Sequence, residues 1–279
     1  MYKPSMLALS IVFLFSCKKS TLPVATALKE TEVDLSTHKL MTYSITNKNS
    51  KYLVLFESGL GDGHESWNLS GVAGNLVALS DSIKSDILLY DRAGYGKSGF
   101  NASPRNINKL RSELEAVISQ FANGRKIVLV GHSLGGMIVR DYAIKNPAKT
   151  AAILFVDASH EMYNHPSQAE EDLIYNTLKT AYGANSGAAT EARELMEDSQ
   201  YMTALPNLPN VPVIALTSMK IDANHNAADR QLWYNSKEAL RAGVRDFKHV
   251  TTTASGHYIH QEEPILFLNN LKLLLSKLP

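Results

Sequence analysis

The chain of 279 residues contains a single cysteine, Cys17, so no disulfide can form within it. It carries 28 basic and 27 acidic residues, and this balance gives no electrostatic support for binding nucleic acid or a strongly acidic partner. Internal repeats and low-complexity tracts are also absent. With 44% hydrophobic residues, the chain is long enough to bury one sizeable core. The length and composition are therefore sufficient for one sizeable globular domain.

The hydrophobic run near the amino terminus is too short to span a bilayer, since it covers only residues 6–15. Lys3 precedes this run, and Leu14-Phe-Ser-Cys17 ends it. The arrangement resembles a bacterial lipoprotein signal, which implies that Cys17 is lipidated and becomes the first mature residue. The alternative is an ordinary secretory signal that is cleaved nearby.

From this resemblance we expect residues 1–16 to be a signal peptide and residues 17–37, which are polar and small, to be a tether. The expected location is the bacterial cell envelope, with the membrane contacted through lipid on Cys17. If the signal is an ordinary secretory one, the protein is instead soluble, in the periplasm or outside the cell.

The pentapeptide Gly131-His132-Ser133-Leu134-Gly135 fits the pattern Gly-x-Ser-x-Gly. It lies where an apolar, strand-like run gives way to a helical pattern. A sharp turn from strand to helix forces strained backbone at the serine and lifts its hydroxyl clear of the sheet. We therefore predict that Ser133 is a nucleophile.

A serine nucleophile needs a base, and His257 is the candidate. It lies on a loop between the strand-like stretch 247–253 and a helix that begins near Pro264. The ordinary pKa of histidine suits proton transfer near neutral pH. His260, one helical turn further on, is the second choice.

Two further segments complete a family pattern: Glu57-Ser-Gly-Leu-Gly-Asp-Gly63, after an apolar strand, and Asp91-Arg-Ala-Gly-Tyr-Gly-Lys-Ser98. With the serine elbow and the late histidine, they resemble the α/β-hydrolase family over nearly the whole mature length. The family's oxyanion loop is usually written His-Gly, and Ser58-Gly59 stands there in this chain. The resemblance implies that the backbone amides of Leu60 and Leu134 bind the oxyanion.

The expected fold is α/β: a mostly parallel, doubly wound sheet with a helical lid inserted after the sixth strand. The core comprises residues 38–157 and 211–279, and the lid comprises residues 158–210. The candidate strands are 39–46, 52–57, 86–91, 126–131, 151–157, 211–217 and 247–253.

The acid that orients the histidine has two candidates. Asp157 ends the apolar strand 151–157, and this position resembles a subset of the family whose acid follows that strand. The commoner position follows the next strand, 211–217, where Asp222 lies one residue late. We favour Asp157 and keep Asp222 as the alternative.

The lid sequence is acidic, and Gly183 to Gly187 divides it into two helical pieces. We expect its carboxylates to form a solvated face; they are Glu170, Glu171, Asp172, Glu191, Glu194, Glu197 and Asp198. Candidate pocket residues are Leu173, Tyr175, Leu178, Tyr182, Leu195, Met196, Tyr201 and Met202.

The resemblance implies a serine hydrolase that cleaves an ester or similar acyl bond of a small molecule through an acyl-enzyme on Ser133. No metal or organic cofactor is expected, because no ligand spacing or phosphate loop is present. A serine at the elbow argues against the dehalogenase and epoxide-hydrolase branches, which use an aspartate there. The alternatives are an aminopeptidase, amidase or acyltransferase with the same triad, or a binding protein without turnover. The oligomeric state is left open.

Overall fold

A computed structural model describes residues 28–47, 50–68 and 76–279. The predicted signal peptide (1–16) and the lipidation site Cys17 lie outside these residues, as does most of the tether. Within the described part of the chain, no helix is both long and apolar enough to cross a membrane.

One sheet of eight strands forms the centre of the molecule, in the order β1-β2-β4-β3-β5-β6-β7-β8. The strands β3 to β8 run parallel, while β1 and β2 form an antiparallel edge. The bounds are β1 (Lys29–Asp34), β2 (Lys39–Ile45), β3 (Tyr52–Glu57), β4 (Asp86–Tyr90), β5 (Lys126–His132), β6 (Thr150–Val156), β7 (Val213–Ser218) and β8 (Phe247–Thr252). Every predicted strand is found.

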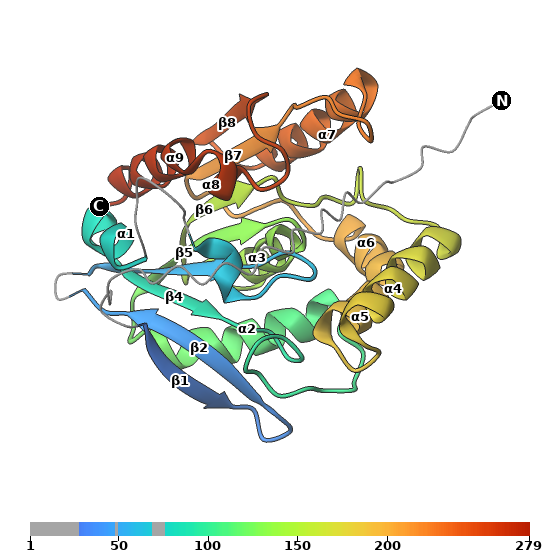
Figure 1. Cartoon of the computed structure of the whole chain (residues 1–279). Coiled ribbons are helices and arrows are strands. Elements are labelled where there is room, and N and C mark those ends of the chain that lie inside the picture. The colour runs from blue at the N-terminus through green and yellow to red at the C-terminus, as the bar shows by residue number, and fades with distance from the viewer. Residues whose placement is uncertain (1–27, 48–49, 69–75) are drawn as a thin grey trace.

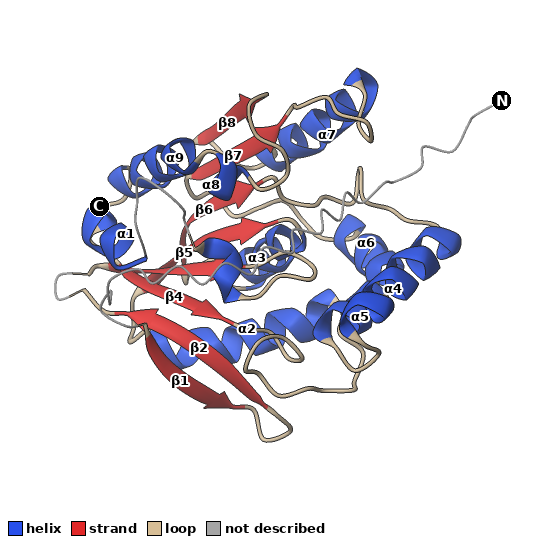
Figure 2. Ribbon diagram, in the orientation of Figure 1, coloured by secondary structure: helices blue, strands red, loops and turns tan. Residues whose placement is uncertain are grey.

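Helices cover both faces of the sheet (Figures 1 and 2). Alternate residues of β3 point to opposite faces, so Leu53 and Leu55 join one buried cluster while Val54 and Phe56 join the other. The first cluster includes side chains of α2 (Ile107–Phe121) and α3 (Leu134–Lys145). The second includes side chains of α1 (Leu76–Ile83) and α9 (Pro264–Ser276). The doubly wound architecture is thereby confirmed.

Residues 158–210, which we call the inserted segment, lie between β6 and β7. They form three helices rather than the predicted two: α4 (Gln168–Tyr182), α5 (Gly187–Ala192) and α6 (Leu195–Thr203). Gly183 ends α4 at φ 90°, as the sequence suggested. The break between α5 and α6 contains no glycine or proline, so no signal in the sequence marks it. Beyond β7 follow α7 (Ala227–Glu238), a short 3₁₀ turn at Ala239–Arg241, and α8 (Ile259–Glu262) after β8. Another 3₁₀ turn, His64–Trp67, follows β3.

The predicted tether was wrong in its last part, because residues 29–34 form β1 and pair along their length with β2. The strand is mostly exposed and polar, so its composition resembles a linker. Val33 is the exception: it packs into the core, and only this tertiary contact distinguishes an edge strand from a tether.

Candidate active site

Ser133 sits at the junction of β5 and α3 in a strained conformation, with φ 51° and ψ −125°. Few residues other than glycine adopt a positive φ, and such strain is kept where the surrounding structure enforces it. The surroundings here are tight: a Cβ on Gly135 would lie 2.3 Å from the carbonyl oxygen of Glu57. The start of α3 therefore packs directly against the end of β3, and the serine is held at the turn as the sequence pattern predicted.

The structure brings His257 and Asp157 together. His257 Nδ1 lies 2.7 Å from Asp157 Oδ2, and the two residues are 100 positions apart in the chain. The Asp157 side chain is buried, whereas that of His257 is 38% exposed. One end of the imidazole is thus fixed by a buried carboxylate while the ring remains accessible to a substrate.

Asp157 is held from its other side as well. Its Oδ1 accepts hydrogen bonds from the backbone amide of Ser218 at 2.9 Å and from Trp233 Nε1 at 2.7 Å. Burial by itself would raise the pKa of Asp157, but the hydrogen bonds and charges around it, led by those of His257, outweigh burial and lower that pKa. The carboxylate is therefore ionised and fixed in orientation.

The two alternative residues lie elsewhere. Asp222 is exposed and bonds His225, the Asn224 amide and Arg230 in its own loop. His260 is fully buried, its Nε2 bonds the carbonyl of Ser66, and burial lowers its pKa to about 3. Asp222 therefore does not orient His257, and His260 is not placed to act as the base for Ser133.

The loop that carries His257 contacts the β5–α3 turn through His132, the residue before Ser133. His132 Nε2 donates to the carbonyl oxygen of His257 at 3.1 Å, and the two rings are 4.6 Å apart. Burial, followed by the neighbouring His257 and His260, lowers the pKa of His132 far below its ordinary value. A neutral His132 can therefore pack beside His257 without charge repulsion.

The loop after β3 approaches the elbow closely, as the oxyanion prediction requires. A Cβ on Gly59 would lie 3.1 Å from the Cβ of Ser133. Leu60 and Leu134 line the same cavity as Ser133. Among the described residues, neither the Leu60 amide nor the Leu134 amide donates a hydrogen bond to a protein group. The geometry leaves both amides available to an oxyanion, whose binding stays a prediction.

Arg92 ties this loop to the inserted segment. Its guanidinium donates to the carbonyl oxygens of Ser58 and Gly59, each at 2.8 Å, and to Glu57 at 2.9 Å. On its other edge it donates to both carboxylate oxygens of Glu191 in α5, at 2.8 and 2.9 Å. A planar, two-sided donor suits this role, because it holds the oxyanion loop and α5 in one fixed relation.

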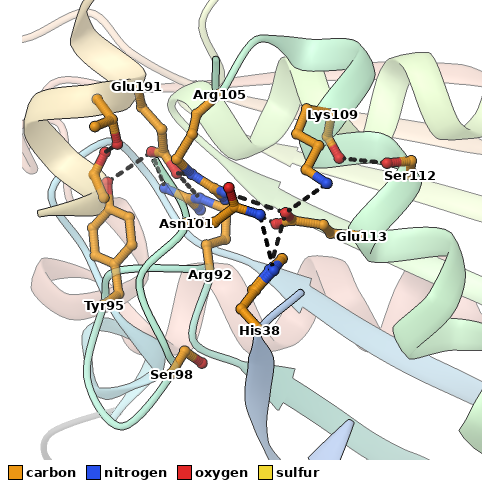
Figure 3. Close-up of polar contacts among 12 residues, drawn as sticks. His38, Arg92, Tyr95, Ser98, Asn101, Arg105, Lys109, Ser112, Glu113 and Glu191 are labelled. Atoms are coloured by element: carbon orange, nitrogen blue, oxygen red, sulfur yellow. Dashed lines mark hydrogen bonds and ion pairs between the residues drawn. The ribbon is translucent and has the colours of Figure 1, made fainter. Parts of the chain in front are cut away.

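A second buried pair continues the network. Arg105 binds Glu113 at 2.8 Å and lies 3.7 Å from Glu191, and all three side chains are buried (Figure 3). Tyr95 donates its hydroxyl to Glu191 at 2.7 Å. The inserted segment is thereby anchored to the core through charges that compensate one another out of water.

A cavity of about 60 Å³ lies beside Ser133, between the elbow and the inserted segment. Its lining is largely apolar; it includes Leu60, Leu134, Met137, Pro166, Ile174 and Leu195. Of the pocket residues predicted from the sequence, only Leu195 is among the cavity's lining residues, while Leu173 and Tyr182 are exposed on the surface.

The acidic face predicted for the inserted segment is only partly present. Glu171, Glu191 and Asp198 are buried, contrary to the prediction. Glu191 is paired with Arg92, and Glu171 accepts the backbone amide of Met196 at 2.8 Å. Asp198 lines the cavity beside Ser133. Charge counts along the chain could not show which carboxylates turn inward.

One cluster has a composition that could hold a metal ion, at His64, Glu65 and Asp91, whose ligand atoms lie within 4.8 Å of one another. The side chains already satisfy each other: His64 Nδ1 lies 2.9 Å from Asp91, which also accepts the hydroxyl of Tyr43 at 2.8 Å. This supports the interpretation that the segment beginning at Asp91 fixes a loop.

The family profile of the alpha/beta hydrolase fold matches residues 52–270, which is most of the chain. The chain belongs to the α/β-hydrolase fold family. An uncharacterised protein of Bacillus subtilis, YqjL, is 25% identical over 217 residues, covering 77% of this chain and 80% of YqjL. A human (lyso)-N-acylphosphatidylethanolamine lipase is 27% identical over 124 residues, which are 43% of this chain and 34% of the lipase.

This α/β-hydrolase is also similar to solved structures of the same fold. The Cif epoxide hydrolase from Acinetobacter nosocomialis superposes with a TM-score of 0.69 at 16% identity, covering 90% of each chain. At that identity the likeness shows the fold alone.

The sequence did not reveal the residues that hold Asp157 on the side away from His257. Trp233 holds Asp157, and Lys237 is fully buried with its Nζ 3.1 Å from the centre of the Trp233 ring. Burial lowers the pKa of Lys237 far below its ordinary value. Both residues lie on α7, whose sequence resembles that of an ordinary amphipathic helix.

Proposed function

We propose that the protein is a serine hydrolase that cleaves a carboxylic ester, or a similar acyl bond, of a small molecule. The observation that carries the proposal is the 2.7 Å contact between His257 Nδ1 and buried Asp157. His257 packs on His132, and the next residue is the serine held at positive φ. The family's named members include hydrolases with esters or epoxides as substrates, and the serine in place of an elbow aspartate favours acyl transfer here.

In the proposed mechanism, Ser133 Oγ attacks the substrate carbonyl while His257 Nε2 takes the serine proton. Asp157 keeps the other imidazole proton on Nδ1 and stabilises the imidazolium. The amides of Leu60 and Leu134 bind the oxyanion, and His257 returns the proton to the leaving alcohol. Water, activated by the same histidine, then hydrolyses the acyl-enzyme.

We further propose that the inserted segment acts as a lid that shapes the substrate site. The support is its position: Ile174 of α4 together with Leu195 and Asp198 of α6 line the cavity beside Ser133. The pairs from Arg92 to Glu57 and Glu191 link this segment to the oxyanion loop, so the two are expected to keep a fixed relation.

The test is to treat the full chain with a fluorophosphonate probe and to assay p-nitrophenyl butyrate hydrolysis. We expect Ser133→Ala to abolish both labelling and turnover. Ser119→Ala is the matched control, because Ser119 is an exposed serine on α2, away from the site, and should retain both. A folded wild-type chain that neither labels nor turns over would refute the proposal and favour a binding protein.

A further inference from the structure

Asp198 is the one carboxylate of the described chain that lines the cavity beside Ser133. It projects from α6 and is only 1% exposed. Its Oδ1 accepts the backbone amide of Ile107 at 2.7 Å, but its Oδ2 is buried and has no hydrogen-bond partner among the described residues. A buried carboxyl oxygen without a partner is costly, and a ligand in the cavity is one way to satisfy it.

The other polar residues that line the cavity, Ser133, Ser159 and Asn164, give this oxygen no hydrogen bond, and most of the lining is apolar side chains. A short aliphatic chain fits these walls and the volume of about 60 Å³. When Asp198 is ionised, this oxygen can only accept, so a ligand that fills the cavity from Ser133 then needs a hydrogen-bond donor where it meets Asp198.

The surrounding charge selects the kind of donor. Glu197 lies on α6 with Asp198, and Glu194 is the residue just before that helix. Glu191 lies on the preceding helix, α5. The three glutamates act on Asp198 as like charges. Arg92 compensates Glu191, but Glu194 and Glu197 have no cationic partner among the described residues. Such a negative potential favours a cation over a neutral hydroxyl.

We propose that Asp198 is a specificity residue which binds a primary ammonium group on the short chain of the substrate that occupies this cavity. This inference rests on the proposed function and names its substrate class as amino-substituted acyl esters. Burial, followed by the neighbouring glutamates, raises the pKa of Asp198 to about 8. An ammonium that binds the carboxylate therefore displaces the proton of Asp198 into solvent near neutral pH.

The experiment compares pairs of benzyl esters in which an ammonium replaces a terminal methyl: 3-aminopropanoate with butanoate, 4-aminobutanoate with pentanoate, and 5-aminopentanoate with hexanoate. For at least one pair, wild-type kcat/KM should favour the amine by about tenfold or more. Asp198→Asn keeps an acceptor for Ile107 and should reduce this ratio at least about tenfold. Asp81→Asn removes the same charge from an exposed position on α1 and should change the ratio less than about twofold.

Binding separates this inference from the proposed function. Titration calorimetry of the same esters on Ser133→Ala should show tighter binding of the amine, with proton release near neutral pH that disappears in Ser133→Ala/Asp198→Asn. If alkyl esters turn over but no amine is favoured at any length, the inference is wrong and the hydrolase assignment stands. If nothing turns over yet the amines bind through Asp198, the inference stands and the hydrolase assignment is wrong.

Discussion

Replacing Asp157 with asparagine should remove most of the activity without disturbing the fold. The Oδ1 of Asp157 accepts two N–H donors, the Ser218 amide and Trp233 Nε1. An asparagine would keep its oxygen at those donors, so its amide group would face His257 Nδ1. That nitrogen must then accept, which moves the imidazole proton to Nε2, where His257 can no longer take the serine proton.

The magnitude follows from the loss of the base. A histidine locked in the wrong tautomer lowers kcat by about 10⁴-fold, or about 5 kcal/mol of transition-state stabilisation. The assay is kcat/KM for p-nitrophenyl butyrate together with the rate of fluorophosphonate labelling, with circular dichroism to confirm folding. Asp222→Asn is the matched control, and we expect it to remain within about twofold of wild type because Asp222 is exposed and bonded in its own loop.

The reasoning is refuted if folded Asp157→Asn keeps activity within about tenfold of wild type. It is equally refuted if Asp222→Asn loses most of its activity, since that would place the functional acid in the loop after β7 and not at the end of β6.

Three other changes test the surroundings of the site. Gly135→Ala should destabilise the protein by about 3 kcal/mol, because its Cβ would lie 2.3 Å from the Glu57 carbonyl oxygen; an unchanged urea midpoint would contradict this contact. Glu191→Gln should cost about 3 kcal/mol, because it leaves the buried Arg92 charge undercompensated, and a melting temperature equal to wild type would argue against the network. Asp198→Asn should stabilise the protein at neutral pH. The pKa of Asp198 is about 8 in the folded state against 3.8 ordinarily, so folding takes up a proton and stability falls between about pH 4 and 8, by about 4 kcal/mol at pH 7. A variant with the wild-type pH slope would contradict this assignment.

The sequence by itself determined the elements whose signals are local. Each buried strand of the parallel sheet has an apolar run, and Gly-x-Ser-x-Gly between a strand and a helix predicts a strained elbow. Ser133 was found this way, and the structure gives it the positive φ that the pattern requires. His257 followed from its place on a loop at the same edge of the sheet.

Other features depended on contacts between distant segments. The sequence could not decide between Asp157 and Asp222, because the decision depends on which of them the folded chain brings to His257. The structure pairs His257 with Asp157. Strand β1 resembles a linker until Val33 packs into the core. The acidic inserted segment gave no sign that Glu191 meets Arg92 or that Asp198 lines the cavity. Periodicity along one element specifies its buried face, whereas the partner of a single polar side chain is decided only when the chain folds and excludes water around it.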